Sequence, residues 1–468
     1  MRQILETEQK ALEINLDGSI YGTLAEIGAG QEVARNFFKV GASSGTIAKT
    51  MSAYDKVVSD EIYGPEAHGR YVCESRLYKM LEHEWVLIEE RLRSVRPDTN
   101  FFVFADTVST MNYQRTIKGD GWLGIRFQSS PDKAPNDLVL HVKLLDNDVQ
   151  LQQQAVGKLG VNMVYACFRF ANDPQTLLLS LMDGLFRRVK IDMVRLDGTD
   201  FATLDPRRLS LWLVQHGMSE VAMFGPDKRN IHPSEFLYKK HVLVVRASFR
   251  PLTLLEEDMI EKGWEQFVNE PEVEVEKSFT LTEITLGNLT ENGPLDEQDF
   301  LDRTELLCAL GQTVIISSCE EYQQLIAYLA DYKVQHLGLV LRAHRLSEFL
   351  SDKYHKNASG SLLTAFGEIF AGGVRIYAYP SVMTDNTTLM AIQNLPLPDG
   401  AKYLYQHLLD HRQIVDIELF NPAVMNIFAS DVLADIRSGK AGWEEMVPGK
   451  VAAVIKQKGL FQAAQAAG

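Results

Sequence analysis

The chain has 468 residues, more than one ordinary hydrophobic core holds, and its length therefore predicts two or three packed units. A hydrophobic fraction of 46% and a charged fraction of 23% are typical of a soluble globular protein and argue against extended disorder. The net charge of −15 argues against non-specific binding to nucleic acid or to an anionic membrane surface, because both need a basic footprint.

The cysteines and the apolar runs predict the compartment. Cys73, Cys167, Cys308 and Cys319 are scattered without a CxxC pair, which is typical of free thiols in a reducing compartment. The first residues, "MRQILETEQKALE", have no apolar run behind the basic residue, and the longest apolar stretches are too short for a membrane span. We therefore expect a cytoplasmic protein with no membrane span.

Residues 1–96 are predicted to form an N-terminal hairpin and helical region. The segment "LEINLDGSIYGTL" alternates around Asp17-Gly18, a dipeptide that favours a tight hairpin turn. Residues 75–95 carry apolar side chains at helical spacing and predict an amphipathic helix, which Pro97 ends. The first 24 residues are thus expected to be extended, and a helix is expected to follow.

Residues 97–270 are predicted to form a first α/β unit, because short apolar runs alternate with helical patterns. The expected strands are 101–106, 121–128, 137–146 and 188–198, and the expected helices include 149–170 and 176–186.

A second α/β unit is predicted over residues 271–395. The acidic stretch "NEPEVEVEKS" is the candidate boundary, and the alternation of strands and helices resumes after it. Residues 396–468 are predicted to form a C-terminal helical segment. The fold class predicted is therefore α/β, with two layered α/β units and helical N- and C-terminal additions.

The segment "AEIGAGQEVARNFF" raises the question of a dinucleotide cofactor. Gly28 and Gly30 match the first two glycines of a G-x-G-x-x-G/A turn, but Val33 stands where the third small residue belongs. Its branched side chain would obstruct the close approach of helix to strand, so a glycine-rich connection into a helix is favoured. The sequence does not identify a cofactor.

A polar cluster is predicted on the hairpin formed by "GWLGIRFQ" and "DLVLHVKLLD". Alternation places Arg126 and Gln128 on one face, and we expect them to pair across from His141 and Lys143, with Asp106 arriving from the neighbouring strand. Arginine and lysine bind phosphate or carboxylate and histidine exchanges protons, so Arg126, Gln128 and Lys143 are the candidate substrate ligands. His141 and Asp106 are the candidate catalytic groups. The alternative is a solvent-facing sheet surface.

Two further segments carry polar side chains that raise the question of a site. Ser317 and Ser318 follow a buried strand, where open α/β sheets bind ligands, and they are further candidate substrate ligands. The alternative role for either serine is to cap the next helix. The stripe of His344, Glu348, Asp352 and His355 is looser than transition-metal signatures, so no metal site is predicted.

Four segments carry a family resemblance: "GWLGIRFQ", "LHVKLLD", "GQTVIISSCEEYQQLIAYLADY" and "SLLTAFGEIFAGGVRIYAYP". They resemble a family of bacterial soluble proteins of similar length to which no function is assigned. Its members are sometimes labelled nicotinate-nucleotide adenylyltransferase or TonB-dependent receptor. The motifs here support neither label, because "AHGR" lacks the second histidine of (H/T)xGH and no outer-membrane barrel pattern is present. The resemblance implies no catalytic residue.

The function expected from the sequence is binding of a small anionic metabolite, with a nucleotide among the candidates and transferase or hydrolase chemistry as the reactions to consider. Whether the protein is an enzyme is left open. The alternative is a homo-oligomeric scaffold without chemistry, because no strong catalytic motif is present and the apolar helices near the C-terminus would suit packing on a neighbour. A homo-oligomer is expected in either case.

Overall fold

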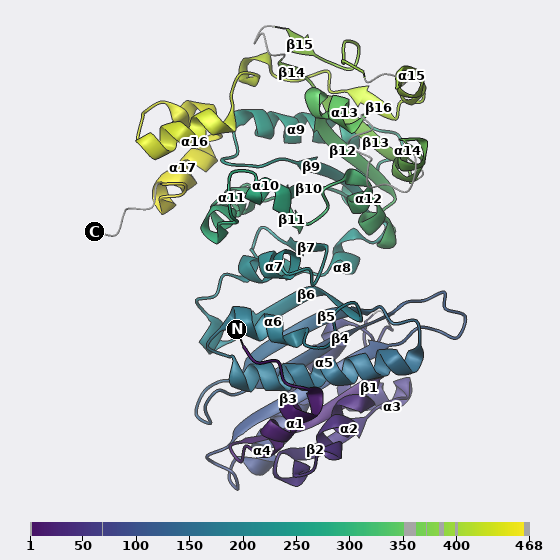
Figure 1. Cartoon of the computed structure of the whole chain (residues 1–468), viewed down its shortest axis with the longest axis vertical. Coiled ribbons are helices and arrows are strands. Elements are labelled where there is room, and N and C mark those ends of the chain that lie inside the picture. The colour runs from purple at the N-terminus through teal and green to yellow at the C-terminus, as the bar shows by residue number, and fades with distance from the viewer. Residues whose placement is uncertain are drawn as a thin grey trace. The chain divides into compact units, whose positions relative to one another are not determined.

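The structure is a computed structural model that describes residues 2–67, 69–350, 362–370, 372–382, 388–397 and 401–462. The chain divides into two compact units, Met1–Ser219 and Glu220–Gly468 (Figure 1). Each unit is built on a β-sheet interleaved with helices, which confirms the predicted α/β class.

The first unit contains a six-stranded mixed sheet with the order β2-β1-β3-β4-β5-β6. Strands β2, β1 and β3 are parallel, and β3 to β6 pair antiparallel in succession. The strands are β1 (Ile20–Gly28), β2 (Ile47–Ser52), β3 (Asn100–Ser109), β4 (Gly119–Phe127), β5 (Asn136–Leu144) and β6 (Val189–Asp197).

Helices cover both faces of this sheet (Figure 1). Helix α4 packs Leu77 and Trp85 against the face that carries Phe101 and Val103, whereas Gly160 of α5 lies against Phe104 on the other face. The helices are α1 (Thr7–Asn15), α2 (Gln31–Lys39), α3 (Lys56–Tyr63), α4 (Glu74–Leu92), α5 (Val149–Arg169), α6 (Pro174–Leu181) and α7 (Pro206–Gln215), with short 3₁₀ turns at Ser43–Gly45 and Thr199–Phe201.

The predicted strands of the first unit and its helix at 149–170 are confirmed, but the predicted N-terminal hairpin is wrong. Residues 7–15 form helix α1, and Asp17-Gly18 makes the turn between α1 and β1. The physical reason is the buried Lys10, whose Nζ lies 2.6 Å from Asp183 and 2.8 Å from Asn162. This long-range contact anchors the segment as a helix against α5 and overrides its local alternation.

The second unit contains an eight-stranded sheet with the order β16-β13-β12-β9-β10-β11-β7-β8. From β16 to β11 all neighbours are parallel, and β7 and β8 add an antiparallel edge. The strands are β7 (Val221–Phe224), β8 (Asn230–Ile231), β9 (His241–Arg246), β10 (Ser278–Thr285), β11 (Thr313–Ser317), β12 (His336–Arg342), β13 (Val374–Tyr379) and β16 (Ile414–Asp416); β14 (Ser381–Val382) and β15 (Leu389–Met390) form a separate pair.

Both faces of this sheet are covered as well. On α9, Gly263 lies against Leu243 and Val340, and α12 packs Leu325 and Leu329 on the opposite face. The helices are α8 (Pro233–Leu237), α9 (Leu254–Val268), α10 (Leu286–Thr290), α11 (Glu297–Ala309), α12 (Tyr322–Asp331), α13 (Ala343–Phe349), α14 (Leu362–Phe370), α15 (Lys402–Asp410), α16 (Ala429–Ser438) and α17 (Gly449–Lys458), with 3₁₀ turns at Val275–Lys277, Pro422–Val424 and Trp443–Met446.

The order of the parallel strands creates a topological switch point. The chain runs from β9 through β10 to β11 on one side, then crosses back to β12, β13 and β16 on the other side of β9. The connection after β9 runs toward β10, and the connection after β12 runs the opposite way toward β13. A crevice therefore opens between β9 and β12 at their carboxyl ends. Ligands of doubly wound sheets bind at that position.

The predicted boundary between 270 and 271 falls inside the second unit, because β9 and β10 on its two sides pair in one sheet. The acidic stretch is the end of the crossover from α9 to β10. Residues 1–96 and 396–468 are likewise not separate additions, since they supply β1, β2 and β16 to the two sheets. Helices α16 and α17 do lie at the C-terminal end of the second unit.

Candidate functional site

The predicted hairpin forms, but its register differs from the one expected. Phe127 pairs with Asn136 at the closed end, so Arg126 lies opposite Asp137, and His141 lies opposite Trp122. Arg126 and His141 therefore share a face but stand four residues apart along the strands, roughly 13 Å. The expected pairing of Arg126 and Gln128 with His141 and Lys143 is wrong.

The two predicted ligand-binding groups at the closed end of the hairpin have structural partners. Arg126 forks onto both carboxylate oxygens of Asp137 at 2.8 Å and also contacts Glu82. The buried amide of Gln128 donates to the carbonyls of Pro131 and Lys133, at 3.2 and 2.9 Å, and accepts from the Arg93 guanidinium at 2.6 Å. Gln128 thus fastens the loop that joins β4 to β5, and Arg126 ties β4 to β5 and to α4.

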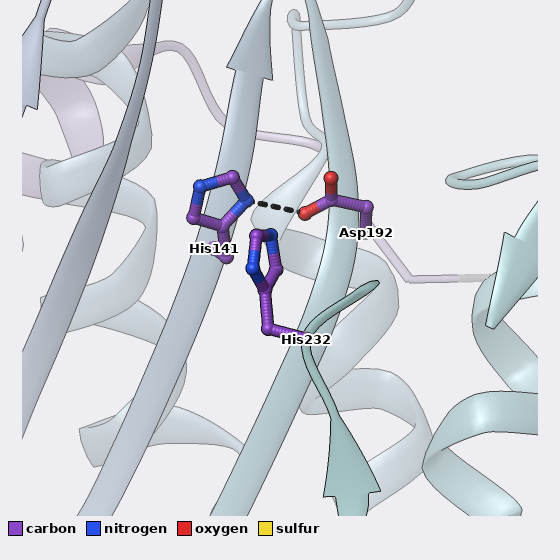
Figure 2. A group of neighbouring side chains, drawn as sticks. All are labelled: His141, Asp192 and His232. Atoms are coloured by element: carbon purple, nitrogen blue, oxygen red, sulfur yellow. Dashed lines mark hydrogen bonds and ion pairs between the residues drawn. The ribbon is translucent and has the colours of Figure 1, made fainter. Parts of the chain in front are cut away.

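His141 is buried and lies beside an acid that the sequence reasoning missed. Its Nδ1 is 2.6 Å from Oδ1 of Asp192 on the neighbouring strand β6 (Figure 2), and its ring meets Trp122 edge-on at 5.0 Å. A carboxylate at this distance fixes the orientation of an imidazole ring. The available signal was Asp192, a carboxylate between apolar residues in the middle of the strand "VKIDMVRLD". His232, also drawn in Figure 2, belongs to the second unit, where its Nδ1 lies 2.7 Å from the Ser234 hydroxyl.

Lys143 and Asp106 do not join His141. Lys143 sits two positions further along β5, where it lies opposite Asp120 and Lys190 in the register. Asp106 pairs with Leu123 rather than with Trp122, which places it on the opposite face of the sheet from His141. The expected catalytic pair is therefore separated by the sheet itself. Asp106 is fully buried beneath the start of α2, next to Gly30.

Ser317 ends strand β11 in the second unit, Ser318 follows it, and neither caps a helix. Helix α12 begins four residues later with Glu321 as its N-cap. The buried Ser317 hydroxyl donates to Oε1 of Glu283 at 2.6 Å, and the Ser318 amide donates to the carbonyl of Glu220 at 2.9 Å. Ser317 thus supports Glu283 on the adjacent strand β10.

A cleft of about 380 Å³ occupies the switch point of the second sheet. The ends of β9, β10 and β12 contribute Arg246, Thr285 and Arg342 to it, so three separate strands build its floor. The remaining lining includes Ser248, Glu256, Asn288, Glu291, Glu320, Tyr322, His344 and Arg345.

Arg246 is held rigidly in this floor. Its guanidinium donates to both carboxylate oxygens of the fully buried Glu283, at 2.7 and 3.0 Å, and to the carbonyl of Glu320 at 3.1 Å. It also stacks 4.0 Å from the centre of the Tyr322 ring. Burial raises the pKa of the Tyr322 phenol to about 12, so the phenol stays protonated at neutral pH. The charge of Arg246 is therefore balanced within the protein.

Arg342, at the end of β12, is a cation without such a partner. No described residue forms a hydrogen bond or ion pair with it, and its Nε is buried and unbonded. Burial lowers the pKa of this guanidinium, and the nearby Glu256 opposes that shift in part. A half-buried guanidinium with open donors in a cleft is a natural contact for phosphate or carboxylate.

The start of the helix that follows β9 is partly closed by its own side chains. Oε2 of Glu256 accepts from the Thr253 amide at 2.8 Å and contacts the Thr253 hydroxyl, closing the start of α9 with a capping box. The turn "RASFRPLT" also lacks glycine. This departs from the dinucleotide-binding turn, in which the helix start takes the pyrophosphate. An anion in this cleft must therefore depend on side chains, Arg342 first among them.

Sequence reasoning missed Arg246, Glu283 and Arg342, although a signal was present. The strands "HVLVVR" and "HLGLVLR" are apolar runs that each end on an arginine. The histidine and carboxylate stripe of the sequence analysis is only partly described. His344 lines the cleft, and its Nδ1 lies 3.0 Å from the Ser381 hydroxyl. Asp352 and His355 lie outside the described residues.

The comparisons with known proteins add little to this geometry. No protein-family model matches the chain, and no curated protein matches it. Similar solved structures include the competence/damage-inducible protein CihA from Agrobacterium tumefaciens, 17% identical over 36% of this chain and 98% of that one, with a TM-score of 0.26. A CinA superfamily protein from Klebsiella pneumoniae is 9% identical over 35% and 98%, also with a TM-score of 0.26. Similarity at this level carries no argument for function.

Proposed function

We propose that the protein binds a small anionic metabolite in the switch-point cleft of the second unit. The observation that carries this proposal is Arg342, a half-buried guanidinium that lines the cleft and has no partner among the described residues. Leaving a buried charged donor unpaired costs stability, which a bound phosphate or carboxylate would restore. The candidate anion ligand is therefore Arg342 of the second unit, in place of Arg126 and Lys143 of the first unit.

The rest of the lining favours an anion that also carries hydroxyl groups. Glu291 and Glu320 offer carboxylates as hydrogen-bond acceptors, and Ser248 supplies a hydroxyl. In doubly wound folds an acidic side chain accepts hydrogen bonds from ribose hydroxyls, and the cleft volume of about 380 Å³ suits a small metabolite. A sugar phosphate or a mononucleotide fits this combination, and transferase or hydrolase chemistry on such a molecule is the reaction class to test.

The first test is a thermal-shift titration with inorganic phosphate, ribose 5-phosphate and adenosine monophosphate. A ligand present at 100 times its Kd adds roughly 2.7 kcal/mol to the free energy of unfolding. Arg342→Gln should abolish most of that stabilisation. The matched control is Arg437→Gln, which removes the same charge from an exposed position on α16 that does not line the cleft.

Two outcomes would contradict the proposal. One is stabilisation of the wild type by none of the three anions, and the other is an unchanged Kd in Arg342→Gln. Native mass spectrometry of the same samples also counts subunits, which tests the predicted homo-oligomer and the alternative of a scaffold that binds no metabolite.

The predicted cytoplasmic location and the family resemblance stay predictions. Within the part of the chain that the structure describes, no helix has the length and apolar character needed to cross a bilayer.

A further inference from the structure

The parallel strands of the first unit also have a topological switch point. The connection after β1 runs through α2 to β2, and the next connection crosses back past β1 through α3 and α4 to β3. Helix α2 lies on the face of the sheet where α5 packs, because its Val33 lies against Gly160 of α5, whereas α4 covers the other face. A ligand site is therefore expected between β1 and β3 at their carboxyl ends.

A cavity of about 520 Å³ lies at this position. Gly28 and Ala29, at the end of β1, line it together with Val108 and Ser109 at the end of β3. Sites for small organic molecules have volumes in this range. The position and the size of the cavity therefore both suit a small molecule.

The lining of this cavity is uncharged. Among the described residues that line it, none is an aspartate, glutamate, lysine, arginine or histidine, although charged residues make up 23% of the chain. The cleft of the second unit differs, because arginine and glutamate side chains line it. An ion that entered the cavity of the first unit would lose water without gaining an opposite charge, which is costly. The lining therefore favours an uncharged ligand.

Two tyrosine rings at the cavity are open to solvent. Tyr54 is 80% exposed and Tyr71 is 37% exposed, and neither ring has an aromatic or cation–π contact with a described residue. Their backbones are held in place. Tyr54 precedes Asp55, the N-cap of α3, and the carbonyl of Tyr71 accepts a hydrogen bond from the Thr107 hydroxyl at 2.6 Å. Exposed rings on an anchored backbone offer flat surfaces on which a planar ring can stack.

Two polar side chains of the lining also have open hydrogen-bonding groups. Thr110 and Gln153 are half-buried, and neither side chain forms a hydrogen bond with a described residue. By contrast, the amide of Gln31 donates to the Gly28 carbonyl at 2.6 Å. A primary amide both donates and accepts, which matches the polar edge of a nucleobase, and a hydroxyl can pair with a ribose hydroxyl.

We propose that this cavity binds an uncharged nucleoside. The base stacks on the tyrosine rings, Gln153 bonds to the edge of the base, and Thr110 bonds to a ribose hydroxyl. A nucleoside combines a planar ring with polar edges and no charge, whereas a free sugar lacks the planar ring and a nucleotide carries charge. The site is separate from the anion cleft of the second unit, and the proposal does not depend on anion binding there.

Calorimetric titration of the full chain with adenosine, uridine and ribose tests this proposal. We expect adenosine to bind more tightly than uridine, because its base has a larger stacking surface, and ribose to bind at least about fivefold more weakly than adenosine. Tyr54→Ala should raise the Kd for adenosine at least about fivefold, because it removes a stacking ring. Gln153→Leu should raise that Kd by a similar factor, because it removes the amide while keeping the volume of the side chain.

Two control variants separate loss of binding from loss of structure. Tyr54→Phe keeps the ring and should leave the Kd for adenosine within about a factor of two of the wild-type value. Tyr403→Ala removes a tyrosine that is 86% exposed on α15 of the second unit and does not line the cavity, so the Kd should not change.

Three results would overturn the proposal. The first is a wild type that binds neither nucleoside. The second is a Kd for adenosine that is unchanged in both Tyr54→Ala and Gln153→Leu. The third is ribose binding as tight as adenosine binding, which would make the cavity a site for sugars.

Discussion

Both units place charged side chains at the carboxyl ends of parallel strands beside a following helix, yet the two sites have opposite character. In the first unit the start of α2 has no side-chain cap. The buried Asp106 of β3 lies beneath it, and Glu26 of β1 occupies the paired position in the register. In the second unit the start of α9 is closed by Glu256, and the nearby guanidinium of Arg342 is left open. The comparison teaches that the helix start influences which charged group remains without a partner at the strand edge: buried carboxyls in the first unit and a half-buried guanidinium in the second.

The largest expected effect tests whether the buried position of Asp106 requires a residue without a side chain at Gly30. Gly30→Ala adds a Cβ that would lie 2.0 Å from Asp106, and we expect a loss of about 3 kcal/mol in the free energy of unfolding. Urea denaturation measures it. Gly18→Ala, at a position with nothing within 4 Å of the added Cβ, should change stability by less than about 1 kcal/mol. Equal effects of the two substitutions would show that Asp106 is not confined by Gly30.

The next effect concerns pH and Glu26 alone. Burial raises the pKa of Glu26 from 4.5 to about 7, so the folded state binds more protons than the unfolded state between these values. The stabilisation that this proton provides is complete below pH 4.5 and is lost as the pH rises to about 7.

Relative to Glu26→Gln, the wild type should therefore lose roughly 3 kcal/mol of stability across that interval. Urea denaturation at a series of pH values measures the difference between the two proteins. The free energy of unfolding of the wild type minus that of the control Glu32→Gln should change little over the same pH interval. If the difference between the wild type and Glu26→Gln also stays constant, Glu26 is not a buried, protonated group.

The smallest expected effect concerns the capping box at the start of α9 in the second unit. Thr253→Ala removes one side of the capping box at α9 and should lower the free energy of unfolding by about 1 kcal/mol. It also frees Glu256 to interact with Arg342, so phosphate should bind more weakly than to the wild type. Calorimetric titration with phosphate measures this change. Tighter phosphate binding in the variant would show that Glu256 does not compete for Arg342.

Local pattern was enough to predict much of the fold, because strands such as 101–106 and the helix at 149–170 are long, periodic and buried as their residues require. The local pattern gave a wrong prediction where a contact between residues far apart in the sequence determines the structure. Helix α1 depends on Lys10 meeting Asp183, and the hairpin register depends on which residues close the loop after Phe127.

The candidate sites were less predictable than the fold. Asp106 was recognised, but its partner Glu26 lies on a strand far away in the sequence and becomes a neighbour only through parallel pairing. Arg342 and Arg246 each end an apolar strand, and the sequence does not say which of them finds a carboxylate. Glu283 resolves that choice by pairing with Arg246 on the adjacent strand.

The central position of β9 also has a consequence for synthesis of the protein. Both neighbours of β9 are translated after it, and β12 leaves the ribosome only after β10 and β11 have been made. Until then the growing chain carries an apolar strand with an unpaired edge, the kind of surface that invites aggregation and engages chaperones. The cleft is therefore completed late in the synthesis of the second unit. A nascent chain that stops before Arg342 would contain Arg246 at the end of β9 but would lack the proposed anion ligand.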